Sequence, residues 1–231
     1  MVKNHMKRIT APKTWNVSRK TTKFITKPHP GAHKLGHGVA INTFFKELVK
    51  LTNTTKETKY VLTNDEVLVN NRRRRDFKTQ VGFLDIVSVK SLNKHFLITV
   101  DSKGALRAKE IDEVKAKSRL LKISGKLAIG KDKFQLNTFA GENLIVLGAD
   151  AKKYAVGDSL IVEVGSMKIL DHIVLKEQSL VFVYQGKHSG KSGVLESASQ
   201  KTVTIKSGDS SFETSDDYLI AINKEKLAEF E

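Results

Sequence analysis

The sequence predicts a multi-domain α+β protein: an extended basic N-terminal arm, a small α/β domain, a central β domain and a C-terminal SH3-like β-barrel. Three observations predict this organisation. Positive charge is concentrated at the front of the chain, helical periodicity follows it, and short apolar runs separated by turn residues fill the remainder. The expected boundaries are 1–40 for the arm, 41–90 for the α/β domain, 91–175 for the central β domain and 176–231 for the barrel and tail.

The arm is identified by its uncompensated positive charge. The first acidic residue of the chain is Glu47, and ten lysines and arginines precede it. Residues 1–90 hold 19 basic and 6 acidic side chains, which gives +13, so nearly all of the net charge of +15 lies there. Such a segment repels itself and gains order along a polyanion, which predicts nucleic-acid binding with a steep salt dependence. We therefore expect residues 1–40 to be protease-sensitive in the free protein.

Two helices are expected after the arm. Apolar residues at helical spacing from Phe44 to Leu51 predict a short amphipathic helix. Thr54 and Glu57 have the spacing of a capping box and predict the start of a second helix. That helix is expected to end near Asn64, with the asparagine as a left-handed cap.

A hairpin that carries four arginines is expected next. Glu66–Val69 has the composition of a strand, and Asn70-Asn71 can adopt the positive φ of a tight turn. Arg72–Arg75 would then lie at an exposed hairpin edge, where guanidinium groups can bind phosphates with two hydrogen bonds each. The alternative is a solvated charge run without a partner.

The remaining sequence indicates β structure. Short apolar runs at 96–100, 120–123, 127–129, 134–136, 143–147, 160–164 and 167–175 are separated by glycine and charged turns, which is typical of a small barrel or sandwich. This central region has no cationic excess and no catalytic cluster. We expect it to serve as a scaffold.

A glycine-rich loop, Gly186–Gly193, follows an apolar strand at 179–184. Its Gly-Lys-Ser ending does not make a phosphate-binding P-loop, because only three residues separate Gly186 from Gly190 and an alternating strand follows instead of a helix. Strand, loop and two further strands are typical of one end of an SH3-like barrel. Lys187, His188 and Lys191 would then bring positive charge to the loop tip. The alternative is a plain hairpin loop with solubilising lysines.

Several classes of site are excluded or disfavoured. The absence of cysteine excludes disulfides, thiolate metal sites and cysteine nucleophiles, and it suits a reducing cytoplasm. No apolar run approaches the length of a membrane span, so no membrane partner is expected. His29, His33 and His37 recur every four residues, but the prolines and glycines among them prevent a continuous helix and no cysteine completes a ligand set. No metal is expected.

Four motifs in chain order resemble one family. Asn4–Trp15 resembles the opening K-H-L-K-R-x-A-A-P-x-x-W, and Lys27–Leu35 is similar to R-P-S-x-G-P-H-K-L. Glu66–Asp76 with Val81–Val89 resembles K-V-x-V-D-G-R-V-R-x-D followed by P-x-G-x-M-D-V-I-S-I. Gly186–Gly193 resembles the G-G-x-x-x-G-R-I-G loop of a KOW module. The family is that of archaeal and eukaryotic small-subunit ribosomal proteins of the "S four e" type.

The resemblance implies that 41–90 is an RNA-binding domain of the bacterial "S four" type and that 176–231 is a KOW barrel. It implies a structural component of the small ribosomal subunit in the cytoplasm, in contact with small-subunit rRNA and neighbouring small-subunit proteins. No catalysis, cofactor or small-molecule substrate is expected. The residues expected to contact RNA are Lys3, Lys7, Arg8, Lys13, Trp15, Arg19, Lys20, Lys27, His33, Lys34 and His37 in the arm, Arg72, Arg73, Arg74, Arg75 and Lys78 around the hairpin, and Lys187, His188 and Lys191 in the loop.

Two other functions remain open at this point. An RNA-modifying enzyme could use residues 43–90 to hold RNA, but it would need a catalytic domain in 91–231. That stretch shows no dinucleotide fingerprint, paired carboxylates or convincing nucleophile. A free KOW-containing transcription or translation factor is the other possibility, and it predicts a protein found mostly off the ribosome.

Overall fold

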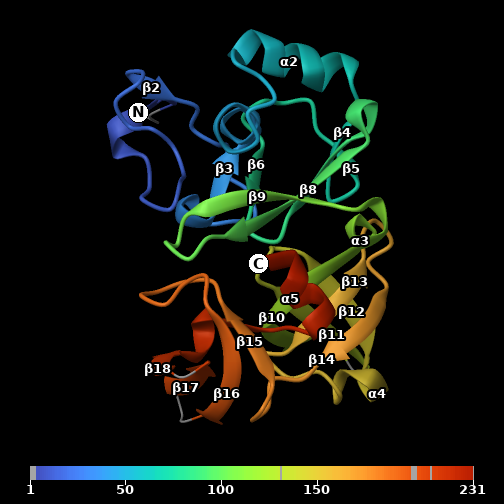
Figure 1. The fold of residues 1–231 in the computed structure, drawn as a ribbon. Coiled ribbons are helices and arrows are strands. Elements are labelled where there is room, and N and C mark those ends of the chain that lie inside the picture. Colours follow the sequence, from blue (N-terminus) through green and yellow to red (C-terminus); the bar gives the residue numbers. More distant parts are fainter. Residues whose placement is uncertain (1–3, 131, 199–201, 209, 231) are drawn as a thin grey trace. The chain divides into compact units, whose positions relative to one another are not determined.

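The chain forms two compact units in a computed structural model (Figure 1), which describes residues 4–130, 132–198, 202–208 and 210–230. Unit 1 comprises Met1–Thr99 and Ala105–Lys117, and unit 2 comprises Val100–Gly104 and Ser118–Glu231. The fold is mixed, with most of its regular structure in sheets. Among the helices of the described residues, none is long and apolar enough to cross a membrane.

Unit 1 has three sheets: β1-β2, β3-β6 and the five-stranded β5-β4-β7-β8-β9. Its elements are β1 (Met6–Lys7), η1 (Arg8–Thr10), β2 (Phe24–Ile25), η2 (Leu35–His37), β3 (Gly38–Ala40), α1 (Ile41–Thr43), η3 (Phe44–Leu48), α2 (Thr55–Asn64), β4 (Val67–Val69), β5 (Arg72–Arg73), β6 (Gln80–Gly82), β7 (Ile86–Val89), η4 (Lys90–Leu92), β8 (Lys94–Val100), β9 (Leu106–Ile111) and α3 (Glu113–Ala116).

The expected helices form, with two differences. The first is continuous from α1 into η3, which has π-helical geometry, and it buries Phe44 and Phe45. Phe44 packs edge-on against Phe96 of β8, with ring centroids 6.1 Å apart, so the helix covers the five-stranded sheet. Helix α2 begins with the predicted capping box. The left-handed cap expected at Asn64 is wrong: Asn64 is still helical, and Asp65 ends the helix with extended backbone.

The expected arginine hairpin is present. Asn70 and Asn71 have φ values of 51° and 63°, as a two-residue turn requires, and Val69 pairs with Arg72 across it. The small and polar asparagines tolerate this backbone region, which most side chains avoid. Because the turn is tight, the arginine run follows it immediately and begins next to the buried strand β4.

The arm is folded, contrary to the extended conformation expected from its charge. β1 pairs with β2, so that Met6 lies opposite Ile25, and β3 pairs with β6. Ala11 and Trp15 are buried. Burial of these apolar side chains favours packing of the arm, and the charge of the segment does not reveal it. Because the arm is packed, the protease sensitivity that the sequence predicts for the free arm is no longer expected.

Two expected boundaries also differ from the structure. The β3-β6 pairing joins the arm to the α/β domain in one sheet. Strand β8, expected in the central β domain, pairs with β7 through a turn in which Asn93 is left-handed, so it belongs to unit 1. The sequence indicates where strands form but not which strands pair with one another, and the domain boundary depends on that pairing.

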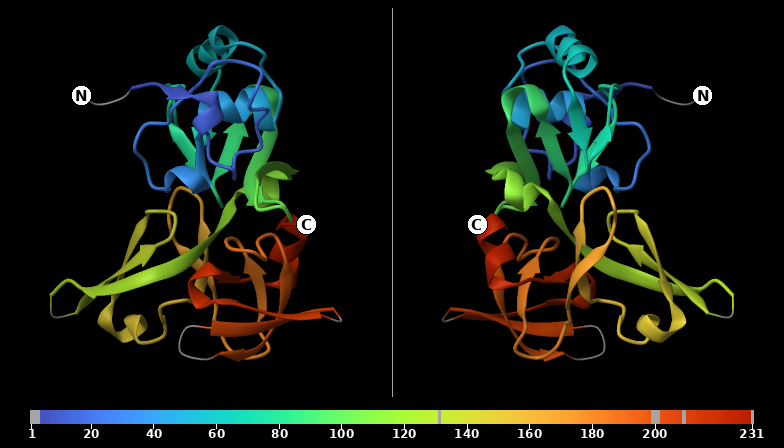
Figure 2. Two further views of the ribbon diagram at one scale, coloured as in Figure 1. Left: turned by 90° about the vertical axis from the view of Figure 1, so that its left-hand side faces the viewer. Right: turned by 90° about the vertical axis from the view of Figure 1, so that its right-hand side faces the viewer.

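Unit 2 contains two five-stranded antiparallel sheets, β12-β11-β10-β13-β14 and β18-β17-β16-β15-β19, which occupy separate parts of the unit (Figure 2). Its elements are β10 (Ser118–Ala128), β11 (Lys133–Thr138), β12 (Asn143–Leu147), α4 (Gly148–Ala151), β13 (Ser159–Glu163), β14 (Ile169–Ile173), β15 (Leu180–Val183), β16 (Ser192–Ala198), β17 (Thr202–Ser207), β18 (Ser210–Ser215), η5 (Asp216–Tyr218), β19 (Leu219–Ala221) and α5 (Lys224–Phe230).

Each sheet of unit 2 has its own core. Leu121, Leu136 and Leu160 belong to the first core, and Val183 and Ile205 belong to the second. The expected boundary between 175 and 176 falls between β14 and β15. Strand β10 is one long strand where the sequence suggested two, while β18 and α5 were not predicted.

Candidate nucleic-acid interface

Half of the expected RNA contacts of the arm that the structure describes are exposed. Lys27 and His37 are half-buried, and Lys3 lies outside the described residues. The exposed members are Lys7, Lys13, Arg19, Lys20 and Lys34. Folding thus keeps these cations in solvent while Ala11, Trp15 and Ile25, which lie between them in the sequence, are buried.

Three expected contacts are buried and engaged within the protein, so the expectation that they bind RNA directly is withdrawn. Arg8 is 5% exposed, and its Nη2 donates to Glu47 Oε1 at 2.6 Å. Trp15 is 3% exposed, and its indole N–H donates to the Leu35 carbonyl oxygen at 3.0 Å. His33 is 8% exposed and lies in the interior beside a carboxylate. Arg8 and His33 have exposed counterparts of the same residue type in the arm, Arg19 and His29, so only the packing separates them.

The carboxylate beside His33 is that of Asp85, which is 3% exposed and joins three segments of unit 1. His33 Nε2 lies 2.9 Å from Oδ2, and the Gly82 backbone N–H donates to the same oxygen at 2.7 Å. Asn70 Nδ2 donates to Oδ1 at 2.9 Å, and Asn70 Oδ1 accepts from the Ile86 N–H at 3.0 Å. Asp85 therefore fixes the arm and the asparagine turn to the strand that precedes β7.

Gly82 makes the approach of His33 possible. A Cβ at this position would lie 2.5 Å from the His33 ring and 2.6 Å from the His37 carbonyl oxygen. Both distances are far below van der Waals contact. The glycine of the Val81–Asp85 motif is therefore required by packing of the arm.

The arginine run is exposed over its whole length, from Arg72 to Arg75. Arg73 Nη2 reaches the Thr63 carbonyl oxygen at 3.4 Å, and no ion pair with a carboxylate forms at any of the four within the described ranges. Positive charge that is neither buried nor neutralised is available to phosphates. Adjacent residues of a strand point to opposite sides, so Arg72 and Arg73 of β5 present guanidinium groups on both faces of the hairpin.

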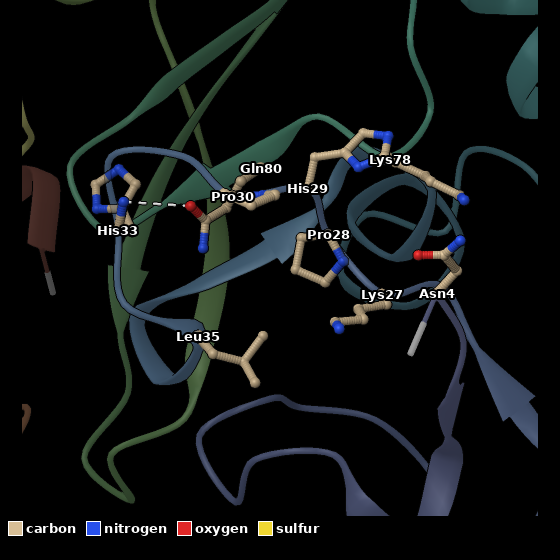
Figure 3. A pocket seen from close by; sticks show the side chains of 9 residues that line it. All are labelled: Asn4, Lys27, Pro28, His29, Pro30, His33, Leu35, Lys78 and Gln80. Carbon is tan, nitrogen blue, oxygen red and sulfur yellow. Dashed lines mark hydrogen bonds between the residues drawn. The ribbon is translucent and has the colours of Figure 1, made fainter. Parts of the chain in front are cut away.

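A cavity of about 470 Å³ opens between the arm and the segment after the arginine hairpin (Figure 3). Lys27 and Lys78 line it together with Pro28, Leu35 and Gln80. Lys78 was expected to contact RNA, but Gln80 and Asn4, which also lines the cavity, were not. Gln80 is uncharged and lies in no charge run or quoted motif, so its place in this cavity could not have been predicted from the sequence.

The glycine-rich loop of unit 2 presents only part of its expected cationic surface. Lys187 and Lys191 are exposed, but His188 is half-buried and stacks on Phe212, with ring centroids 4.4 Å apart. A Cβ at Gly190 would clash with the Asp101 carbonyl oxygen. This glycine therefore admits the chain's own backbone.

Burial shifts the pKa values of two side chains of unit 2, Lys122 and Tyr184. Burial lowers the pKa of Lys122, whose ammonium donates to the Asp216 and Asp217 carbonyl oxygens at 3.0 Å each. Burial raises the pKa of Tyr184 to about 12, and its hydroxyl donates to the Asp217 carbonyl oxygen at 2.8 Å. These bonds secure η5 and belong to the structure of the unit. Within the described residues, no cluster of three His, Cys, Asp or Glu side chains is suited to a metal ion.

Models of two protein families match the sequence. The model described as Ribosomal family S4e matches residues 92–169, and the RS4NT (NUC023) domain matches residues 2–36. The second match covers most of the arm.

Relatives match over nearly the whole chain. The small ribosomal subunit protein eS4 of Methanocella arvoryzae is 33% identical over 99% of this chain and 97% of its own length. That of Methanospirillum hungatei is 34% identical over 97% and 96%. The crystal structure of the 30S ribosomal protein S4e from Thermoplasma acidophilum has a TM-score of 0.70 and 25% identity, and it covers 82% of this chain and 97% of that chain. These matches, together with the fold and the motifs, show that the chain belongs to the S4e family of small-subunit ribosomal proteins.

Proposed function

We propose that this chain is a structural component of the small ribosomal subunit that binds small-subunit rRNA through the exposed cations of unit 1 and the glycine-rich loop of unit 2. Its relatives carry the name of a small-subunit protein, and the family is one of ribosomal proteins and not of enzymes. Neighbouring small-subunit proteins would be its other partners, and the cytoplasmic ribosome its location. The observation that carries the proposal is a run of four exposed arginines without a carboxylate partner in the described residues.

Unit 1 offers two cationic surfaces for RNA. One is formed by the exposed arm residues Lys7, Lys13, Arg19, Lys20 and Lys34, and the other by Arg72–Arg75. Each phosphate that such a side chain neutralises adds about 0.7–0.9 to the slope of log K against log salt. The sequence motifs of the two helices and of the asparagine hairpin support an "S four"-type domain within this unit.

The second sheet of unit 2 supports a KOW-type SH3-like barrel. It is a five-stranded antiparallel sheet in which the glycine-rich loop joins β15 to β16. The short helical turn η5 precedes the last strand, β19, which pairs back with β15. Lys187 and Lys191 are its exposed cations at the loop.

The test replaces Arg72, Arg74 and Arg75 with alanine and measures binding to a small-subunit rRNA fragment at several salt concentrations. We expect weaker binding and a salt slope that falls by about 0.7–0.9 for each phosphate that is no longer neutralised. The matched control removes three lysines of the same unit that already pair with glutamates: Lys90 with Glu66 at 2.9 Å, Lys94 with Glu110 at 3.3 Å and Lys117 with Glu113 at 3.3 Å. Equal weakening in both triple variants would mean that net charge, and not the hairpin, attracts the RNA.

Sucrose-gradient fractionation separates the proposed role from that of a free factor. A structural component sediments with small subunits and stays bound through a moderate salt wash. A protein that remains at the top of the gradient would contradict the proposal.

A further inference from the structure

We propose that the cavity of unit 1 holds one unstacked nucleotide of a single-stranded RNA segment, with Gln80 as the group that contacts the base edge. The inference rests on the proposed function, and it names the ligand that the protein takes at this place. RNA recognition commonly uses bases that leave the stack and enter protein pockets.

The cavity has the size and walls that such a nucleotide needs. Its volume of about 470 Å³ lies within the usual range for small-ligand pockets, which is about 300–1,000 Å³. Pro28, Pro30 and Leu35 provide apolar surface for the face of a base (Figure 3). Leu35 remains 43% exposed, so the wall is reachable from solvent and can pack against a ligand.

Gln80 presents a fixed hydrogen-bond donor. Its Oε1 accepts the His33 backbone N–H at 3.2 Å, which determines the orientation of the amide. Two glycines then confine it: a Cβ at Gly31 would lie 2.6 Å from Oε1, and a Cβ at Gly38 would lie 2.9 Å from Nε2. No acceptor for Nε2 is found among the described residues. The Gln80 amide is therefore rigid, and its N–H₂ group lies beside an apolar wall. Such a donor can form a hydrogen bond to an acceptor atom on a base.

Positive charge comes from two sides of the cavity. Lys27 belongs to the arm, and Lys78 follows the arginine hairpin by three residues. The acidic side chain nearest in sequence, Asp76, lies 3.2 Å from His29 Nε2 and also accepts the Lys78 backbone N–H at 2.9 Å. A strand that passes from the hairpin arginines to the arm would therefore bring its phosphates past both lysines.

The open shape favours a strand over a free nucleotide. His29, Pro30 and Leu35 are exposed at the cavity, so it does not enclose a small molecule. A nucleotide that remains linked to its neighbours on both sides can enter such a site, and the surrounding cations then hold the flanking phosphates.

The single tryptophan provides a local signal for the test. The Trp15 indole N–H donates to the carbonyl oxygen of Leu35, directly behind the apolar wall. We would titrate the full chain with single-stranded ten-nucleotide oligoribonucleotides, with a ten-base-pair RNA duplex, with AMP and with inorganic phosphate. Tryptophan emission and the anisotropy of labelled RNA would be followed together. We expect saturable emission changes with single strands only.

The decisive variant is Gln80→Glu, which keeps an oxygen for the His33 N–H and removes the donor. It should weaken single-strand binding about tenfold and abolish the emission change, with duplex binding unaltered. Leu35→Ser, which keeps the main-chain acceptor of Trp15, should act in the same direction. Lys56→Gln, at an exposed position of α2 outside the cavity, is the matched control and should leave both signals unchanged.

The outcomes separate the two proposals. Single-strand affinity and emission that match the wild type in both cavity variants would overturn the inference, and so would an equal emission response to duplex, AMP or phosphate. If RNA binds with the expected salt slope but Trp15 stays silent, the cavity inference fails and the proposed function stands. If no RNA binds at low salt, the proposed function fails as well.

Discussion

Replacing Asp85 with alanine removes the acceptor at which three segments of unit 1 meet. The carboxylate accepts hydrogen bonds from the Gly82 backbone N–H and Asn70 Nδ2, and it lies 2.9 Å from His33 Nε2. It is 3% exposed, so water cannot easily replace it in the folded protein. The variant should therefore loosen the arm and the asparagine turn together.

The magnitude follows from the buried donors. A donor left unsatisfied in the interior costs about 1–3 kcal/mol, and three groups would be deprived of this acceptor. Removal of the carboxylate also removes its own desolvation cost, which reduces the sum. We therefore expect the free energy of unfolding of unit 1 to fall by about 3–5 kcal/mol, in the lower part of the range that three deprived groups would give.

The assay is urea unfolding followed by the fluorescence of Trp15, which reports on unit 1 because it is the single tryptophan and lies in the arm. Asp112→Ala is the control, since this carboxylate is 81% exposed and its ion pair with Lys115 Nζ is long, at 3.8 Å. It should change stability by less than about 0.5 kcal/mol. A decrease below about 1 kcal/mol for Asp85→Ala would contradict this prediction, because each unsatisfied donor alone should cost that much.

Three further predictions concern other parts of the chain. Gly82→Ala should destabilise unit 1 by about 1–3 kcal/mol in the same fluorescence assay, because its Cβ would overlap the His33 ring. Thr54→Ala should reduce stability by about 1 kcal/mol through loss of the α2 cap, and Thr54→Ser should restore it. The pKa of Tyr184, raised to about 12, means that the unfolded chain loses this proton first, so stability should fall between about pH 10 and 12. In Tyr184→Phe, followed by circular dichroism, this part of the decline should be absent.

Local elements were largely predictable because their causes are local. The capping box of Thr54 and Glu57 uses residues three apart, and it forms as expected. The turn at Asn70-Asn71 depends on the backbone preference of asparagine itself. Strand β12 was likewise predicted to the residue, since apolar runs and turn residues mark strands wherever they pair.

Accessibility of the expected RNA contacts was not predictable. Arg8 and Arg19 belong to the same cationic segment, yet one pairs with Glu47 in the interior and the other is exposed. The first acidic residue of the chain thus neutralises a cation 39 positions before it. Composition gives the charge of a segment, but a contact of this separation depends on how the chain packs.

The amino-acid sequence is sufficient to establish a basic α+β chain with a cationic front, a capped helix, an arginine hairpin and a glycine-rich loop, because charge, capping and turn preference belong to residues close in the chain. Only the folded molecule reveals that the arm packs, that Asp85 holds it and that Gln80 faces a cavity. These features join residues dozens of positions apart, and their formation depends on the burial of apolar side chains and on the satisfaction of buried polar groups across those distances.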